Sequence, residues 1–84
     1  MPTIRIKATA EKDIRSLSPP IRERLTQTIL SLRETPFPPG SQKLRDMDRH
    51  YRLRVGDYRI LYEFDAVAGS VTIYRVKHRR EAYR

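Results

Sequence analysis

The chain has 84 residues and contains no cysteine and only two histidines. Without thiols, the protein has no disulfide, no thiolate zinc site and no cysteine nucleophile. The two histidines, His50 and His78, are too few for a histidine metal cluster. We therefore expect no metal ion and no cofactor.

Long apolar runs are also absent. None approaches the roughly 18 residues that a membrane-spanning helix needs, and residues 1–13 lack the apolar stretch of a signal peptide. We therefore expect a cytoplasmic protein with no membrane partner. A chain of this length is expected to form a single domain over residues 1–84 with a small core, so its function must lie on the surface of that domain.

Acidic residues are scarce relative to basic ones, and the formal net charge is +8. A basic surface binds phosphate backbones through counterion release, although a generic solvated surface is an alternative interpretation. Arginine outnumbers lysine by 14 to 4. Arginine binds phosphate through two parallel hydrogen bonds and stays protonated, so the composition favours a polyanionic partner.

The first half of the chain shows the periodicity of a strand and then of helices. Ile4 and Ile6 alternate with polar residues, which predicts a strand, and Thr9 is a predicted helix N-cap. Ser18 and Pro19 suit the N-cap and the first turn of a helix that starts again after a break. We expect either a helical hairpin or one sharply kinked helix, ending before residue 36. Its apolar positions recur every three or four residues: Ile14, Leu17, Ile21, Leu25, Ile29 and Leu32.

The second half begins with a proline-rich loop over Pro36–Gly40, and a short helical turn around Leu44 is predicted within Gln42–Asp48. The pattern then changes to period two. The predicted strands are His50–Val55, Tyr58–Asp65 and Val71–Val76, and Gly56-Asp57 suits a two-residue hairpin turn. Four aromatic residues fall on the apolar phase and are interpreted as core: Tyr51, Tyr58, Tyr62 and Phe64.

These elements predict an α+β fold. Its order is an N-terminal strand, a helical hairpin and then a three-stranded antiparallel meander. The helices are expected to pack on one side of a twisted sheet of about four strands.

The hairpin register predicts a cluster of arginines. Counting outward from the turn, Arg54 faces Arg59, and Arg52 lies two residues along on the same face. Like charges opposed across a ladder are destabilising, so we infer that this face binds an anion. The alternative is a structural ion-pair network with an acidic neighbour: Glu63, Asp57 or Glu81.

A basic segment, residues 77–84, follows the last predicted strand. It is either a solvated, disordered end or part of the functional site. His78 and Tyr83 can exchange or donate protons and can stack on a base, which favours the second interpretation.

Two segments resemble the RelE branch of the RelE/ParE toxin superfamily: Tyr51–Glu63 (YRLRVGDYRILYE) and Val76–Tyr83 (VKHRREAY). The resemblance implies a RelE-like fold and the toxin of a type II toxin–antitoxin module. Such a toxin enters the ribosomal A site and cleaves the mRNA there, which inhibits translation. In that family the 2′-hydroxyl of the substrate attacks the adjacent phosphate, and no metal is needed. A cognate antitoxin that neutralises the toxin, in a hetero-oligomer, is also implied.

The resemblance also assigns roles by motif position. Arg52, Arg54, Arg59 and Arg79 would clamp and neutralise the phosphate, and Tyr83 would orient the nucleotide or take part in proton transfer. His78 is a further candidate acid or base. The expected RNA-binding residues of the tail are Lys77, Arg80 and Arg84.

One departure from the best-known pattern concerns the general base. Lysines usually occupy the positions of Arg52 and Arg54, and an arginine effectively never loses its proton. The base is therefore left open among His78, Tyr83 and Glu81, or catalysis rests on electrostatics and on orientation by ribosomal RNA. Two other functions stay open: a ParE-like toxin that binds DNA gyrase without RNA chemistry, and a degenerate toxin that only binds its antitoxin.

Overall fold

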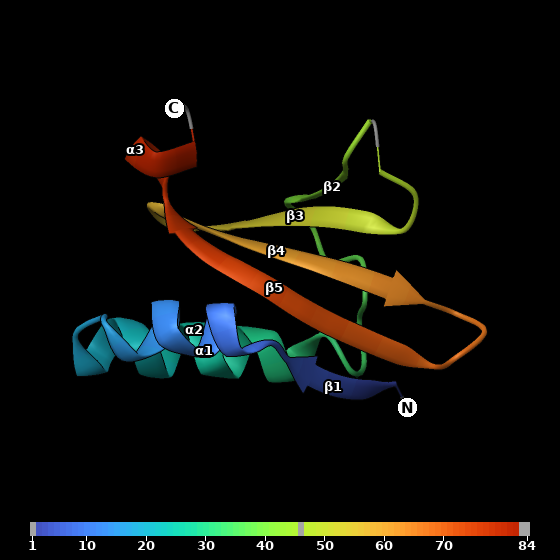
Figure 1. Cartoon of the computed structure of the whole chain (residues 1–84), viewed down its shortest axis with the longest axis horizontal. Helices are drawn as coiled ribbons and strands as arrows, with labels where there is room; N and C mark the ends of the chain where they lie inside the picture. Colours follow the sequence, from blue (N-terminus) through green and yellow to red (C-terminus); the bar gives the residue numbers. More distant parts are fainter. Residues whose placement is uncertain (1, 46, 83–84) are drawn as a thin grey trace.

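The computed structural model describes residues 2–45 and 47–82, and for residues 81 and 82 it describes the backbone alone. The chain runs from a short strand through two helices into a series of strands and ends in a short helix (Figure 1). The elements are β1 (Thr3–Ile6), α1 (Ala8–Arg15), α2 (Pro19–Ser31), β2 (Ser41–Lys43), β3 (His50–Val55), β4 (Tyr58–Asp65), β5 (Ser70–His78) and α3 (Arg79–Ala82).

The described strands form one five-stranded mixed sheet in the order β1-β5-β4-β3-β2. Strand β1 runs parallel to β5, and the other neighbours are antiparallel. The expected α+β fold is confirmed, but the sheet has one strand more than predicted. The extra strand is β2, where we predicted a helical turn: Ser41–Lys43 pairs with Tyr51–Leu53 of β3. The backbone groups of this segment form their hydrogen bonds with β3. In a helical turn they would have formed them within the segment itself.

Helices α1 and α2 form the hairpin that was one of the two predicted alternatives. Ser18 is the N-cap of α2 and Pro19 its first residue, as expected, although the Ser18 side chain makes no capping hydrogen bond. The prediction for α1 was wrong, because the helix begins at Ala8 and Lys7 is its N-cap. The hydroxyl of Thr9 instead donates to the carbonyl oxygen of Tyr74 at 2.8 Å, so it bonds to β5 rather than to its own helix.

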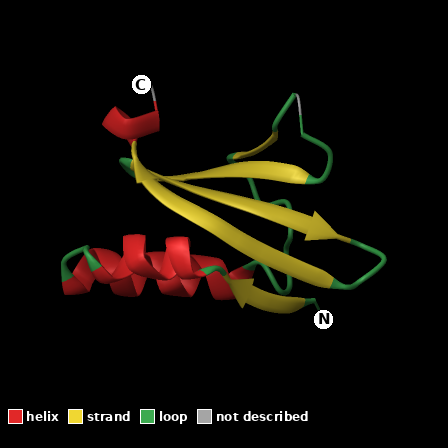
Figure 2. Cartoon of the chain, viewed as in Figure 1, coloured by secondary structure: helices red, strands yellow, loops and turns green. Residues whose placement is uncertain are grey.

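The core lies between the two helices and one face of the sheet (Figure 2). The aromatic residues interpreted as core are in or against it: Tyr62 is fully buried, and Tyr51, Tyr58 and Phe64 pack on the buried cluster. The buried apolar residues are Ala10, Ile14, Leu25, Ile29, Leu32, Leu53, Ile60, Tyr62, Val71, Ile73 and Val76. Within residues 2–45 and 47–82, no helix is long and apolar enough to cross a membrane.

Helix α1 protects the outer edge of β5 beyond the end of β1. The Asp13 carboxylate accepts hydrogen bonds from the Val76 backbone N–H at 3.0 Å and from Nε of Arg75 at 2.8 Å. Burial alone would raise the pKa of Asp13, but the hydrogen bonds from Arg75 and Val76 and the nearby positive charges hold that pKa below its usual value. A charged side chain on an otherwise free strand edge also opposes edge-to-edge association.

The substitution Asp13→Asn tests this contact. Because the pKa of Asp13 is depressed in the folded state, its ionised form stabilises the protein above the ordinary aspartate pKa, and this contribution is lost as the pH falls through the folded-state pKa. We expect the variant to lose about 1–3 kcal/mol of unfolding free energy at pH 7, and the loss should shrink below about pH 4. Urea unfolding across this pH range measures both effects. Asp48→Asn, at an exposed position between β2 and β3, is the control, and an equal loss in the control would contradict the assignment.

Candidate active site

The β3–β4 hairpin has the predicted register. Val55 pairs with Tyr58, and Arg54 pairs with Arg59. Gly56 takes a φ of +59°, and Asp57 is not among the residues with positive φ, as a two-residue turn with glycine first requires. Because side chains alternate between the two faces of a strand, the buried residues of β3 and β4 face the helices and the arginines face away from them.

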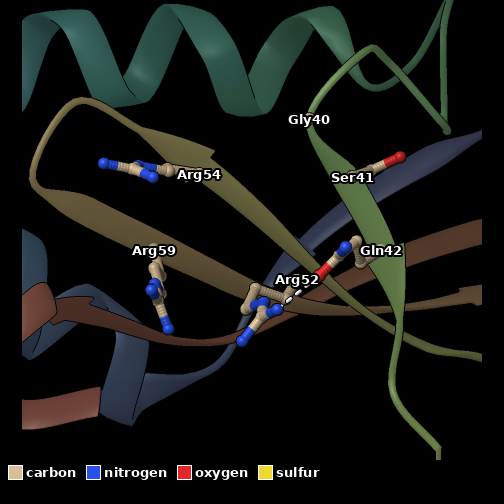
Figure 3. Close-up of a pocket in the computed structure, with 6 residues that line it drawn as sticks. All are labelled: Gly40, Ser41, Gln42, Arg52, Arg54 and Arg59. Atoms are coloured by element: carbon tan, nitrogen blue, oxygen red, sulfur yellow. Dashed lines mark hydrogen bonds between the residues drawn. The ribbon is translucent and has the colours of Figure 1, made fainter. Parts of the chain in front are cut away.

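Three arginines of this hairpin surround one cavity on the face that α1 and α2 leave uncovered. The cavity has a volume of about 360 Å³ and is lined by Gly40, Ser41, Gln42, Arg52, Arg54 and Arg59. Figure 3 shows the side chains of Arg52 and Arg59 extending into the same region, while that of Arg54 extends toward the β3–β4 turn. Three guanidinium groups around one cavity suit an anion with several oxygen atoms, such as a phosphate.

Each arginine is held by its surroundings. Arg59 is only 9% exposed. Nε of Arg54 donates to the carbonyl oxygen of Gly56 at 3.4 Å, and Nη2 of Arg52 donates to Oε1 of Gln42 on the paired strand β2. The two hydrogen bonds and the burial of Arg59 limit the rotamers of these long side chains, so less conformational entropy is lost when an anion binds.

The wall of the cavity opposite the arginines comes from the loop before β2 and from β2 itself. Gly40 has a φ of +94°, a conformation that side chains other than glycine rarely adopt. The Tyr62 hydroxyl donates to the carbonyl oxygen of Pro36 at 2.7 Å and anchors the loop to the core. Burial raises the pKa of Tyr62, with an opposing contribution from a hydrogen bond with Ser41. A fully buried residue therefore fixes the position of this wall.

The sequence interpretation missed three residues that line the cavity: Gly40, Ser41 and Gln42. The glycine after a proline-rich loop was a usable signal for a constrained turn. No local pattern marks Gln42, because its place beside Arg52 follows from the pairing of β2 with β3.

The alternative of a structural ion-pair network does not describe Arg52 and Arg54, which hydrogen-bond to uncharged oxygens. Asp57 instead approaches Arg79, with 3.8 Å between Oδ1 and Nη1. Glu63 interacts with Tyr74 instead. Burial and the nearby Glu63 carboxylate together raise the pKa of Tyr74. The third acid named in that alternative, Glu81, has a side chain outside the described part of the structure.

The basic C-terminal segment divides between the two faces of the sheet. Lys77 pairs directly with Arg59 and so lies on the arginine face. His78 pairs with Tyr58, and the two rings meet edge to face with centroids 5.2 Å apart, so His78 lies on the helix-facing side, away from the arginine cavity.

The remaining residues of the segment lie beyond β5. The backbone N–H of Arg79 donates to the Asp57 carbonyl oxygen at 2.7 Å, which places Arg79 beside the β3–β4 turn. Arg80 is exposed on α3. Tyr83 and Arg84 lie outside the described residues. Among the residues that the structure does describe, no three His, Asp or Glu side chains gather closely enough to hold a metal ion.

Comparison with known proteins identifies the family. Residues 4–83 match the family model described as the ParE toxin of the type II toxin–antitoxin system parDE. The chain belongs to the RelE/ParE superfamily of type II toxins. Its curated relatives include toxin RelG of Mycobacterium tuberculosis, to which it is 32% identical over 83 residues, covering 98% of this chain and 95% of that toxin.

Solved structures of the superfamily share its architecture. The toxin–antitoxin complex RelBE2 of Mycobacterium tuberculosis matches with a TM-score of 0.81 and 31% identity, covering 93% of this chain and 99% of that chain. The archaeal RelE–RelB complex of Pyrococcus horikoshii matches with a TM-score of 0.83 and 25% identity, covering 93% and 94%. The RelE-like fold expected from the sequence is therefore confirmed.

The substitution Tyr62→Phe tests how the core supports this cavity. It removes the buried hydroxyl that bonds to Pro36, so we expect a loss of about 1–2 kcal/mol of unfolding free energy. Chemical denaturation at pH 7 measures this loss. Tyr51→Phe, on the neighbouring strand, is the matched control because its hydroxyl is not part of this contact. A Tyr62→Phe variant as stable as the wild type would show that the hydroxyl does not anchor the loop.

Proposed function

We propose that this toxin is a metal-independent endoribonuclease that cleaves mRNA in the ribosomal A site and thereby inhibits translation. The observation that carries the proposal is the cavity of about 360 Å³ lined by Arg52, Arg54 and Arg59 on the face opposite the helices. Similarity to toxin RelG and to RelE structures along almost the whole chain supports an RNA-cleaving toxin over other members of the superfamily.

The proposed reaction is an internal transesterification of RNA. The 2′-oxygen of one nucleotide forms a bond to the adjacent phosphorus, and the bond from phosphorus to the 5′-oxygen of the next nucleotide breaks. The 2′-hydroxyl loses a proton and the leaving 5′-oxygen gains one, which gives a 2′,3′-cyclic phosphate and a 5′-hydroxyl. The pentacoordinate phosphate carries additional negative charge in the transition state, and three guanidinium groups around it supply the compensating charge.

The position of Arg59 strengthens this electrostatic effect. Its side chain is almost entirely shielded from water, and charge interactions weaken less where water is excluded. Arg79 is placed differently, in an exposed ion pair with Asp57 in which both side chains are more than half exposed. Such a pair contributes little free energy, so Arg79 can leave Asp57 for a phosphate at small cost.

Proton transfer is assigned to the C-terminal segment. Arginines do not exchange protons near neutral pH. His78 packs against Tyr58 on the other side of the sheet, which disfavours it as acid or base in the arginine cavity. We therefore assign orientation of the nucleotide to Tyr83, and proton transfer to Tyr83 or Glu81. Lys77, Arg80 and Arg84 are assigned to binding the RNA backbone.

The proposed partners are the ribosome with its mRNA and a cognate antitoxin, all in the cytoplasm. Structures similar to this chain include complexes of RelE-type toxins with their antitoxins. A cationic face with an open cavity is a surface that an antitoxin can neutralise by covering it. The alternative of a ParE-like gyrase inhibitor is less favoured, because the similar proteins include toxin RelG and RelE toxins of RelBE complexes.

A cleavage assay on translating ribosomes tests the proposal. The purified toxin is added to a ribosome–mRNA complex, and new 5′ ends are mapped by primer extension beside naked mRNA. We expect ends at A-site codons only when ribosomes are present. Arg59→Ala should lower the cleavage rate more than about tenfold, because it removes charge stabilisation of the transition state, and Tyr83→Phe should also lower it.

The control variant for this assay is Arg33→Ala, which removes an exposed arginine after α2. It should cleave at the wild-type rate. Growth arrest without cleavage would reject the nuclease and favour gyrase inhibition. Neither cleavage nor toxicity would indicate a degenerate toxin that only binds its antitoxin, and full activity of Arg59→Ala would refute the assignment of the site.

A further inference from the structure

The turn between β3 and β4 holds two of the arginines that the proposed function assigns to the phosphate. The Gly56 carbonyl oxygen accepts a hydrogen bond from Nε of Arg54 at 3.4 Å, and the Asp57 carbonyl oxygen accepts one from the Arg79 backbone N–H at 2.7 Å. The Arg79 guanidinium group is held separately, by the Asp57 carboxylate, with 3.8 Å between Nη1 and Oδ1. Because the backbone hydrogen bond does not involve the carboxylate, the Arg79 side chain can leave Asp57 while its main chain stays beside the turn.

The partner of Arg79 differs in charge from the partners of Arg52 and Arg54. Arg52 donates to Oε1 of Gln42 and Arg54 donates to a backbone carbonyl oxygen, and both of these acceptors are uncharged. The Asp57 carboxylate, in contrast, offers a guanidinium group the same kind of charged oxygen that a phosphate offers. Asp57 and an RNA phosphate therefore compete for the same donors of Arg79.

The contact between Asp57 and Arg79 is weak enough for a phosphate to displace it. The side chains of Arg79 and Asp57 are 59% and 63% exposed, and water screens an ion pair at such a position. A second cation also lies nearby: Arg24 of α2 and Asp57 line one cavity of about 240 Å³, and a Cβ atom on Gly56 would lie 3.5 Å from Nη1 of Arg24. When Arg79 leaves, the carboxylate therefore keeps a positive neighbour.

We propose that Asp57 is a positioning residue that holds Arg79 beside the turn and competes for it with the RNA phosphate. The inference rests on the proposed function, because Arg79 must bind the phosphate that is cleaved. Before RNA binds, the ion pair keeps the guanidinium group of Arg79 on Asp57; when RNA binds, the phosphate displaces the carboxylate. Asp57 thus limits the affinity of the toxin for RNA without touching the RNA itself.

The substitution Asp57→Asn tests this competition, because it removes the charge and keeps the backbone carbonyl oxygen, and asparagine suits a turn. The probe is a dinucleotide with a 2′-O-methyl group, which cannot be cleaved. It is titrated into the full-length toxin at low salt, and binding is followed by NMR. We expect the variant to bind the probe about threefold more tightly than the wild type, as the loss of an exposed ion pair allows. Asp57→Ser, which also suits a turn, should have the same effect.

The control for net charge is Asp48→Asn, which makes the same change of charge at another exposed position. It should bind the probe as the wild type does. Two further backgrounds show whether the gain depends on Arg79. In an Arg79→Gln background, Asp57→Asn should change the affinity less than about 1.5-fold, because the carboxylate and the phosphate no longer compete for this side chain. In an Arg24→Gln background, which removes the other nearby cation, the gain of about threefold should remain.

Several results would overturn the competition. They are unchanged or weaker binding by Asp57→Asn, an equal gain in Asp48→Asn, the same gain in the Arg79→Gln background, loss of the gain in the Arg24→Gln background, and no binding of the probe by the wild type.

The cleavage assay on translating ribosomes separates this inference from the proposed function. We expect Asp57→Asn to lower KM about threefold and to leave kcat unchanged, because the competition acts on binding. A lower kcat would indicate a merely structural role of Asp57 and contradict the inference. Cleavage with an unchanged KM in Asp57→Asn would retain the nuclease and reject the competition, whereas tighter binding of the dinucleotide without any cleavage would retain the competition and reject the nuclease.

Discussion

The register of the β3–β4 hairpin is the constraint on which the site depends. The two-residue turn at Gly56 and Asp57 places Arg54 opposite Arg59 and puts Leu53 and Ile60 on the helix-facing side. A slip of one residue would turn the arginines into the core and the apolar residues toward solvent. The register that forms the core therefore also places three positive charges on the other face. Their mutual repulsion favours binding of an anion there.

The two faces of the sheet are coupled at a few points. Tyr62 is fully buried, yet its hydroxyl reaches Pro36 and anchors the loop that leads into the cavity wall. Gln42 on β2 holds Arg52 on β3, so the pairing of an edge strand sets the position of a charged side chain. On the side of the sheet that the helices cover, the Asp13 carboxylate of α1 accepts a hydrogen bond from the Val76 backbone N–H of β5, beyond the end of β1. Residues outside the hairpin, such as Gln42, therefore also help to position its arginines.

Local patterns in the sequence predicted the hairpin, its turn, both helices and the three arginines, because each follows from a period or a turn signal within a few residues. The strand at Ser41–Lys43 was missed, since three residues without alternation form a strand only through pairing with β3. The N-cap of α1 was also wrong, because Thr9 bonds to Tyr74 far away in the sequence. His78 lies on the helix-facing side of the sheet because the pairing of β4 with β5 shifts in register between Leu61 and Tyr62. No local sequence pattern reveals this shift.

In the proposed function, the arginine face promotes attack by the 2′-oxygen of the RNA on its neighbouring phosphate. The most direct test replaces one 2′-hydroxyl by hydrogen at the cleavage position of a ribosome-bound mRNA and measures cleavage at that position and at an unmodified codon. We expect cleavage to be lost at the modified nucleotide and retained at the unmodified one, where the new ends should carry a 2′,3′-cyclic phosphate and a 5′-hydroxyl. Cleavage at the 2′-deoxy position would contradict this mechanism, because another nucleophile would then attack the phosphate.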